Sequence, residues 1–102
     1  GNRQAMARTS LVTLVGPNAA SALPQGFRLL KAEYLLVSKQ VCCWIEVPTD
    51  PRLPGIALQL RLFRSGDGIP AAYTYVDTAI DALAPEAWHL YARQQETGRQ
   101  VA

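Results

Sequence analysis

Residues 26–48, GFRLLKAEYLLVSKQVCCWIEVP, decide the fold that we predict for this chain. Between residues 28 and 37 apolar and polar side chains alternate, which is typical of a half-buried strand. The even positions share one face: Leu30, Ala32, Tyr34 and Leu36. From Val41 to Val47 both faces carry bulky side chains, which predicts a central strand covered on both sides. The short polar join at residues 37–40 favours a hairpin between the two strands.

The remaining segments also favour strands. Residues 9–16, 56–62 and 73–78 are expected strands, and the second has the cleanest alternation, with Gln59 and Arg61 opposite a leucine stripe. In residues 86–92, Trp88 and Leu90 alternate with His89 and Tyr91. We favour a strand there, although residues 84–92 also fit a short helix begun by a proline.

The segments between these strands read as turns and loops. Residues 18–23 are alanine-rich and fit one helical turn, and Pro85 limits any helix in residues 79–85 to about one turn. Residues 48–55, PTDPRLPG, are expected to form a surface loop. The SGDGIP segment at residues 65–70 predicts a hairpin turn, because it lacks the lysine and the following helix of a phosphate-binding loop.

Together these patterns predict a mainly β fold. We expect a small antiparallel sheet, sandwich or partly open barrel of about six strands, with at most one or two short helical turns. Residues 9–92 form a single β-rich domain in this prediction, between a disordered tail at residues 1–8 and a polar C-terminal tail at residues 93–102. The GNRQA stretch before Met6 is typical of a remnant of recombinant expression.

The composition is that of an ordinary globular protein, with 49% hydrophobic and 18% charged residues. Residues 27–91 hold six Lys or Arg and seven Asp or Glu, so the expected domain lacks the basic stripe of a nucleic-acid-binding surface. We find no secretory signal and no apolar run of membrane-spanning length, and therefore expect a cytoplasmic protein.

Few residues of the sequence are candidates for catalysis, metal binding or disulfide formation. Cys42 and Cys43 are adjacent and point to opposite faces of a strand, so we expect reduced thiols rather than a disulfide. His89 is the only histidine and has no cysteine pair beside it, so we predict no metal, no cofactor and no catalytic residues. The alternative is a small enzyme that uses His89 with Asp67 or Asp77.

Recognition is the function class that the composition favours. Four tyrosines and two tryptophans are many amphipathic aromatics for so small a domain, and some of them have to reach the surface. We predict a surface for a ligand or partner made of Trp44, Arg61, Tyr75 and His89, suited to a planar or anionic ligand. The alternative is that Trp44 and His89 only cap the far side of the sheet. Exposed edge strands also predict self-association, with a dimer as the expected form.

The order of short motifs resembles a known family. LPQGFRLLKAEY, CCWIEV, RLFRSGDGIP, YVDT and AWHLYA follow one another within about residues 11–91. This series is similar to a family of short proteins of unknown function carried by bacteriophages and other mobile elements. The positions that match are Pro24, Gly26, Trp44, Phe63, Gly66, Ile69, Pro70, Thr78, Trp88, His89 and Tyr91. The chain departs from the family pattern at residues 64–67, RSGD, where the family has Gly-Thr-Gly-His.

The resemblance implies a non-enzymatic accessory protein of mobile-element origin. Combined with the aromatic residues, it leads us to expect a module that binds a host protein or a small anionic or planar ligand. A small enzyme or a nucleic-acid-binding protein is the alternative function.

Overall fold

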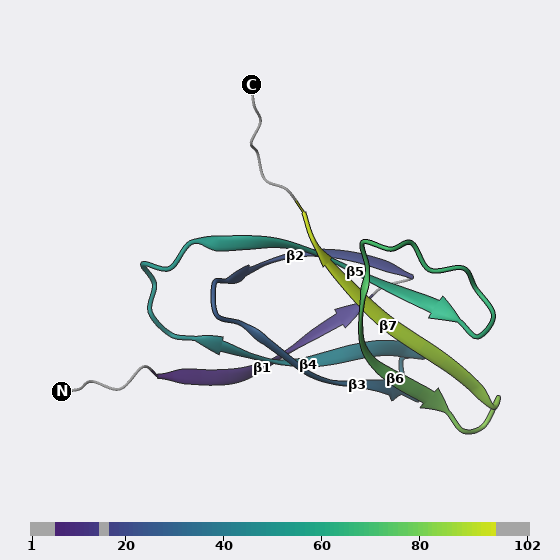
Figure 1. Ribbon diagram of the computed structural model, residues 1–102. Helices are drawn as coiled ribbons and strands as arrows, with labels where there is room; N and C mark the ends of the chain where they lie inside the picture. The colour runs from purple at the N-terminus through teal and green to yellow at the C-terminus, as the bar shows by residue number, and fades with distance from the viewer. Residues whose placement is uncertain (1–5, 15–16, 96–102) are drawn as a thin grey trace.

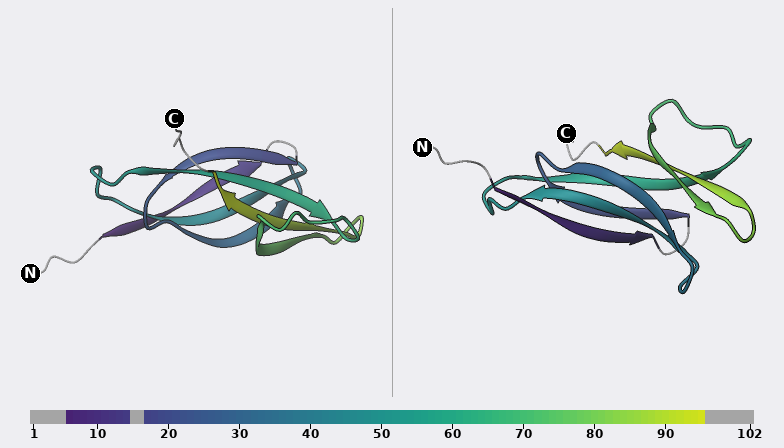
Figure 2. Two further views of the ribbon diagram at one scale, coloured as in Figure 1. Left: turned by 45° about the horizontal axis from the view of Figure 1, so that its top comes forward. Right: turned by 90° about the horizontal axis from the view of Figure 1, so that it is seen from below.

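The computed structural model describes residues 6–14 and 17–95, and every regular element in them is a β-strand. Seven antiparallel strands form two sheets that lie as two layers (Figures 1 and 2). The strands are β1 (Ala7–Leu14), β2 (Asn18–Pro24), β3 (Arg28–Leu35), β4 (Gln40–Pro48), β5 (Gly55–Arg64), β6 (Thr74–Asp81) and β7 (Glu86–Gln94). The prediction of a mainly β fold with antiparallel strands is confirmed.

The three-stranded sheet has the order β1-β4-β3, so β4 is its central strand, as predicted. The inward positions of β4 are buried: Val41, Cys43 and Ile45 are each at most 3% exposed. Both cysteines are free thiols. On the other face Cys42 is fully buried, whereas Trp44 is 39% exposed, so the expected cover on both sides of β4 is incomplete.

The four-stranded sheet has the order β2-β5-β7-β6. The leucine stripe of β5 faces the core, where Leu58 and Leu60 are almost completely buried. Residues 86–94 form a strand rather than a short helix, with Leu90 buried in the core and Trp88 packed against it. Because successive residues of a strand point to opposite faces, the residues next to these buried side chains point away from the core.

The connection between β5 and β6 is not the predicted hairpin turn. Both strands pair with β7 and lie on either side of it, so residues 65–73 cross over β7 (Figure 1). In the right view of Figure 2 this green loop lies on the side of β7 that faces away from β1. The glycine and proline pattern correctly indicated a turn at Gly66, which has a φ of 95°, but local sequence does not report which strand comes next in the sheet.

Two segments expected to have helical character do not form helix. Residues 18–23 belong to β2, which pairs with β5 from Asn18 to Pro24, because the sheet supplies hydrogen-bond partners that outweigh the helix propensity of alanine. In residues 79–85, β6 continues to Asp81 and a turn follows. The Asp81 side chain accepts a hydrogen bond from the Leu83 N–H at 3.1 Å, so Asp81 has a turn role.

Two β-bulges face each other where the sheets meet at one edge. The register shifts at Leu30 in β3 and at Val76 in β6, and these two edge strands adjoin. The Asp77 carboxylate accepts a hydrogen bond of 2.8 Å from the backbone N–H of Ala32. Because of the bulge, Leu30 is 42% exposed and does not share the buried face of Ala32, which corrects the predicted alternation.

The core lies between the sheets and is made of small and medium-sized apolar side chains. The buried cluster is Leu14, Leu23, Ala32, Val41, Cys43, Ile45, Leu58, Leu60, Ala79, Leu90 and Ala92. No polar or charged side chain of the described residues is buried. The sheets therefore hold together by apolar burial, with Asp77 as a polar link at the edge.

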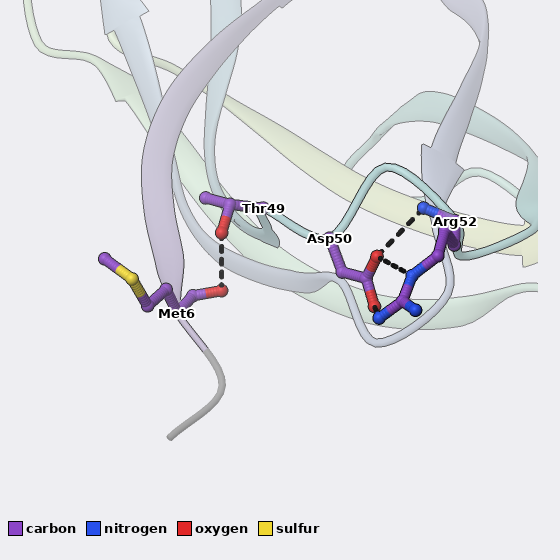
Figure 3. A network of polar contacts seen from close by, with 4 residues as sticks. All are labelled: Met6, Thr49, Asp50 and Arg52. Atoms are coloured by element: carbon purple, nitrogen blue, oxygen red, sulfur yellow. Dashed lines mark hydrogen bonds and ion pairs between the residues drawn. The ribbon is translucent and has the colours of Figure 1, made fainter. Parts of the chain in front are cut away.

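The loop from Pro48 to Gly55 is held by local polar contacts, as Figure 3 shows. The Asp50 carboxylate accepts hydrogen bonds from the Arg52 backbone and guanidinium, which lowers the pKa of Asp50. Thr49 donates from its backbone N–H to the Met6 carbonyl oxygen at 3.0 Å, which anchors the start of β1.

The strands extend slightly beyond the predicted domain limits. β1 begins at Ala7 and β7 ends at Gln94, so parts of both predicted tails belong to strands. The outer parts of these tails, residues 1–5 and 96–102, lie outside the described residues. Residues 15 and 16 of the first predicted strand also lie outside them. Within residues 6–14 and 17–95, no helix is long and apolar enough to span a membrane.

Candidate functional site

Three of the four predicted surface residues share one face, and the fourth does not. Arg61 on β5, Tyr75 on β6 and His89 on β7 project from the outer face of the four-stranded sheet. Trp44 is on β4, in the other sheet. The prediction that Trp44 and Arg61 belong to one surface is therefore wrong. The predicted surface requires β4 and β5 to share a sheet, whereas residues 49–54 carry the chain from one layer to the other.

The outer face of the four-stranded sheet is rich in polar and aromatic side chains. Arg61 lies opposite Tyr91, and Tyr91 lies opposite Tyr75, so these three form a row across the strands. The strand positions on this face are Asn18, Ala20, Ala22, Pro24, Gly55, Ala57, Gln59, Arg61, Phe63, Tyr75, Thr78, Ile80, Ala87, His89, Tyr91 and Arg93. None of them is acidic, so these strand positions carry only positive formal charge.

Phe63 is the centre of an aromatic cluster on this face. It points away from the core yet is only 2% exposed. Its ring packs edge-on against Tyr73 at 5.6 Å and Tyr91 at 5.3 Å between centroids, and Tyr91 packs similarly against Tyr75 at 5.4 Å. Since Tyr73 is at the end of the crossing loop, the loop covers Phe63 and extends the aromatic surface beyond the strands.

Two arginines lie over this cluster. The Arg61 guanidinium carbon is 4.7 Å from the Phe63 ring centroid and 5.9 Å from that of Tyr73. The guanidinium carbon of Arg93 is 5.6 Å from the Tyr73 centroid. Neither guanidinium forms an ion pair with a carboxylate of the described residues. Both are thus oriented by aromatic rings, and their hydrogen-bond donors are available to an outside acceptor.

His89 is held between two hydroxyl groups. Its Nε2 is 2.9 Å from the Ser65 Oγ, and its Nδ1 is 2.9 Å from the Thr78 Oγ1. Thr78 Oγ1 in turn is 2.7 Å from the Tyr75 hydroxyl. The ring is therefore oriented by hydroxyls, rather than by Asp67 or Asp77.

The two aspartates that we considered as partners of His89 have other roles. Asp67 accepts a hydrogen bond from the backbone N–H of Arg64 at 2.7 Å and so closes the turn after β5. Asp77 bonds across to β3 at Ala32. Among the described residues His89 has no acidic orienting partner of the kind found in a triad, although its hydroxyl contacts resemble a serine–histidine pair.

Trp44 lies on the outer face of the three-stranded sheet. Its indole N–H donates to the Glu33 carboxylate at 2.8 Å, and Leu11 of β1 lies opposite it in the register. Leu11 is 40% exposed, similar to Trp44. This arrangement fits the alternative in which Trp44 caps its own sheet.

The thiols and the acidic groups give little support to redox or metal chemistry. Burial raises the pKa of the Cys43 thiol to about 11 and also raises the pKa of Cys42, so both are protonated near neutral pH and are poor nucleophiles. No group of three or more His, Cys, Asp or Glu residues within residues 6–14 and 17–95 is arranged to hold a metal ion.

Several members of this surface were missed in the sequence. Arg93 was assigned to a polar tail, although the alternation of His89 and Tyr91 continues through it and was a usable signal. Phe63 alternates with Arg61 in the same way. Ser65 and Tyr73 carried no such signal, because the crossing loop brings them to this face.

Comparison with known proteins places the chain in a family. The model of a domain of unknown function, DUF7352, matches residues 6–101. The chain belongs to this family. The DUF7352 match includes all seven strands and the crossing loop. Searches of curated proteins and of solved structures gave no match. The predicted membership of a family of unknown function is thereby confirmed, and the mobile-element origin stays a prediction.

Proposed function

We propose that this DUF7352 protein is a non-enzymatic accessory protein of mobile-element origin that binds an acidic segment of a partner protein on the outer face of its four-stranded sheet. The observation that carries the proposal is the pair of arginines, Arg61 and Arg93, stacked on Tyr73 without a carboxylate partner among the described residues. Arginine and tyrosine, together with tryptophan, are enriched among the residues that contribute most to binding at protein interfaces.

The shape and charge of the face favour an extended acidic partner. Tyr75 is 52% exposed and offers apolar area with a hydroxyl, so it suits contact with another chain. A guanidinium held over a ring loses little conformational freedom when it binds a carboxylate in a bidentate manner. The absence of acidic residues at the described strand positions of this face removes competing partners for both arginines.

The test is binding of a fluorescein-labelled peptide of repeating Glu-Tyr, followed by fluorescence anisotropy. We expect saturable binding that weakens as salt is raised, and an affinity lower by about tenfold or more in the double variant Arg61→Ala/Arg93→Ala. The matched control is Arg28→Ala/Arg52→Ala, which removes the same charge elsewhere on the surface and is expected to bind like the parent protein.

Equal loss of affinity in the control variant would contradict the proposal, because it would mean that net charge alone drives binding. Tighter, steeply salt-dependent binding to a generic DNA duplex than to the peptide would favour the nucleic-acid alternative.

The enzyme alternative has one supporting observation, the Ser65–His89–Thr78 series of hydrogen bonds. It requires turnover that disappears in His89→Ala and in Ser65→Ala. If His89→Ala retained any detected turnover, His89 would not be its catalytic base.

We also propose that the protein is cytoplasmic and associates with itself. β1 is an edge strand of its sheet, and its first five residues are exposed, so its backbone is open to pairing with another strand. We expect a dimer by light scattering at micromolar concentration. Finding only the 11.1 kDa monomer would contradict this part of the proposal.

A further inference from the structure

A second candidate site lies at one open end of the sandwich. A cleft of about 520 Å³ lies between the two sheets there, within the size range of small-molecule sites. Residues from every strand except β6, and from the turns next to β2, β4 and β5, line it. Tyr73, Tyr75 and Arg93 of the outer face do not line this cleft, whereas Arg61 lines it and so belongs to both surfaces.

The inner wall of the cleft is apolar and partly aromatic. Leu14, Val41 and Leu62 line it together with the rings of Tyr34 and Trp88. Burial raises the pKa of the Tyr34 hydroxyl, and the nearby Asp81 charge raises it further, so Tyr34 stays neutral. Such a wall favours a ligand with a flat apolar body.

The indole N–H of Trp88 is a buried donor with no hydrogen-bond partner among the described residues. An indole N–H can only donate, so the missing partner has to be an acceptor. The Arg64 guanidinium carbon lies 4.8 Å from the centroid of the Trp88 ring, and the Arg64 side chain is 54% exposed. A ligand that displaces Arg64 uncovers the face of the Trp88 ring, and the unpaired N–H lies at the edge of that ring.

The cleft has an excess of positive charge. Lys39, Arg61 and Arg64 line it, against one acidic residue, Asp67. Arg64 pairs with Glu86, whereas Lys39 forms no ion pair within the described part of the chain. Among the described residues, the charges that are free to meet a ligand at this end are thus the Lys39 ammonium and the Arg61 guanidinium, which favour an anion.

Lys39 has an unfavourable backbone conformation. Its φ is 58°, in the left-handed region that glycine or asparagine adopts at lower cost, and its N–H donates to the Leu35 carbonyl oxygen at 2.7 Å to close the turn. A strained residue that lines a cleft is a reason to suspect a functional role. What lysine supplies here and glycine does not is a positive side chain at the mouth of the cleft.

We propose that this cleft binds a small planar aromatic carboxylate. Its flat body packs against Tyr34 and Trp88, its carboxylate meets Lys39, and one oxygen accepts the Trp88 indole hydrogen bond.

The experiment uses 2-naphthoate as the probe and follows the indole N–H of Trp88 by heteronuclear NMR. The chain has two tryptophans, so the variant Trp44→Phe leaves one indole signal to observe. We expect a saturable shift of that signal toward the hydrogen-bonded range. In Trp44→Phe/Lys39→Gly the affinity should fall about three- to tenfold with the fold preserved, since glycine suits this φ.

Two controls distinguish the proposed site from unspecific apolar binding. The neutral analogue 2-naphthalenemethanol should bind about three- to tenfold more weakly than 2-naphthoate. Arg93→Ala, which removes a charge from the outer face of the other site, should leave the affinity for 2-naphthoate unchanged. The proposal is overturned if the indole signal does not shift saturably, if the alcohol binds as tightly as the acid, or if Lys39→Gly leaves the affinity unchanged.

Discussion

The outer faces of the two sheets each carry one side chain that is buried although it points away from the core. On the three-stranded sheet Cys42 is fully buried, and its neighbours across the strands are Thr13 and Glu33. On the four-stranded sheet Phe63 is 2% exposed and packs against Tyr73, which belongs to the crossing loop. A short side chain is thus hidden by its own sheet, whereas a large one requires a separate segment to cover it.

This difference gives the two outer faces different surface chemistry. The face that carries Trp44 is a plain sheet surface, where polar and apolar side chains meet their cross-strand neighbours. On the other face the loop adds Tyr73, and the rings orient Arg61 and Arg93. A loop that packs on a sheet therefore brings together aromatic and cationic side chains that strand alternation alone does not.

The largest difference in stability between the two faces is expected when the buried phenylalanine is removed. We expect Phe63→Ala to lower the free energy of unfolding by about 3–5 kcal/mol, because it leaves a cavity under the crossing loop. Trp44→Ala on the opposite face should cost less than about 2 kcal/mol, since that side chain is partly exposed already. Urea unfolding of both variants measures the difference, and equal losses would show that the loop does not stabilise the fold through Phe63.

The polar link between the sheets should have the next largest effect. Asp77→Ala leaves the Ala32 N–H without its acceptor, and we expect a loss of about 1–3 kcal/mol in unfolding free energy. Asp77→Asn keeps an acceptor oxygen and should lose less. If both variants were as stable as the parent protein in urea, the two facing bulges would hold the edge without this bond.

The buried Cys43 thiol, on the core side of β4, should make the free energy of unfolding fall at alkaline pH. The pKa of Cys43 is raised to about 11 in the folded protein from 9.0, so the stabilising effect of the neutral thiol is complete below pH 9 and is lost as pH rises toward 11. We expect this loss to be about 1–2 kcal/mol. Unfolding free energies at neutral and alkaline pH should fall less steeply in Cys43→Ala than in the parent, and identical slopes would contradict the prediction.

The smallest effects concern exposed arginines on the two faces. Arg28→Ala removes an ion pair with Glu46 at 3.1 Å between exposed or half-exposed side chains, and should cost less than about 0.5 kcal/mol. Arg61→Ala removes contacts with two aromatic rings and should cost about 0.5–1 kcal/mol. Melting temperatures compared side by side would measure both. A large loss for Arg61→Ala would make this arginine part of the scaffold rather than a recognition residue.

Much of the strand content was predictable because each strand keeps its own local pattern. The β5 leucines and the alternation from Trp88 to Tyr91 placed these side chains on the correct faces. The prediction was wrong where a partner strand overrides local preference, as for the alanines of β2, and where a bulge shifts the alternation, as at Leu30. Neither effect is visible in a short window of sequence.

The sequence by itself determined most of the strands and the free thiols, because these depend on residue type and on spacing along one segment. Only the tertiary structure decided that β4 and β5 lie in different sheets, which separates Trp44 from Arg61. It also decided that residues 65–73 cross β7 and bring Tyr73 and Ser65 to Phe63 and His89. The physical reason is that pairing between distant strands depends on the burial of all the apolar faces together, which no single segment encodes.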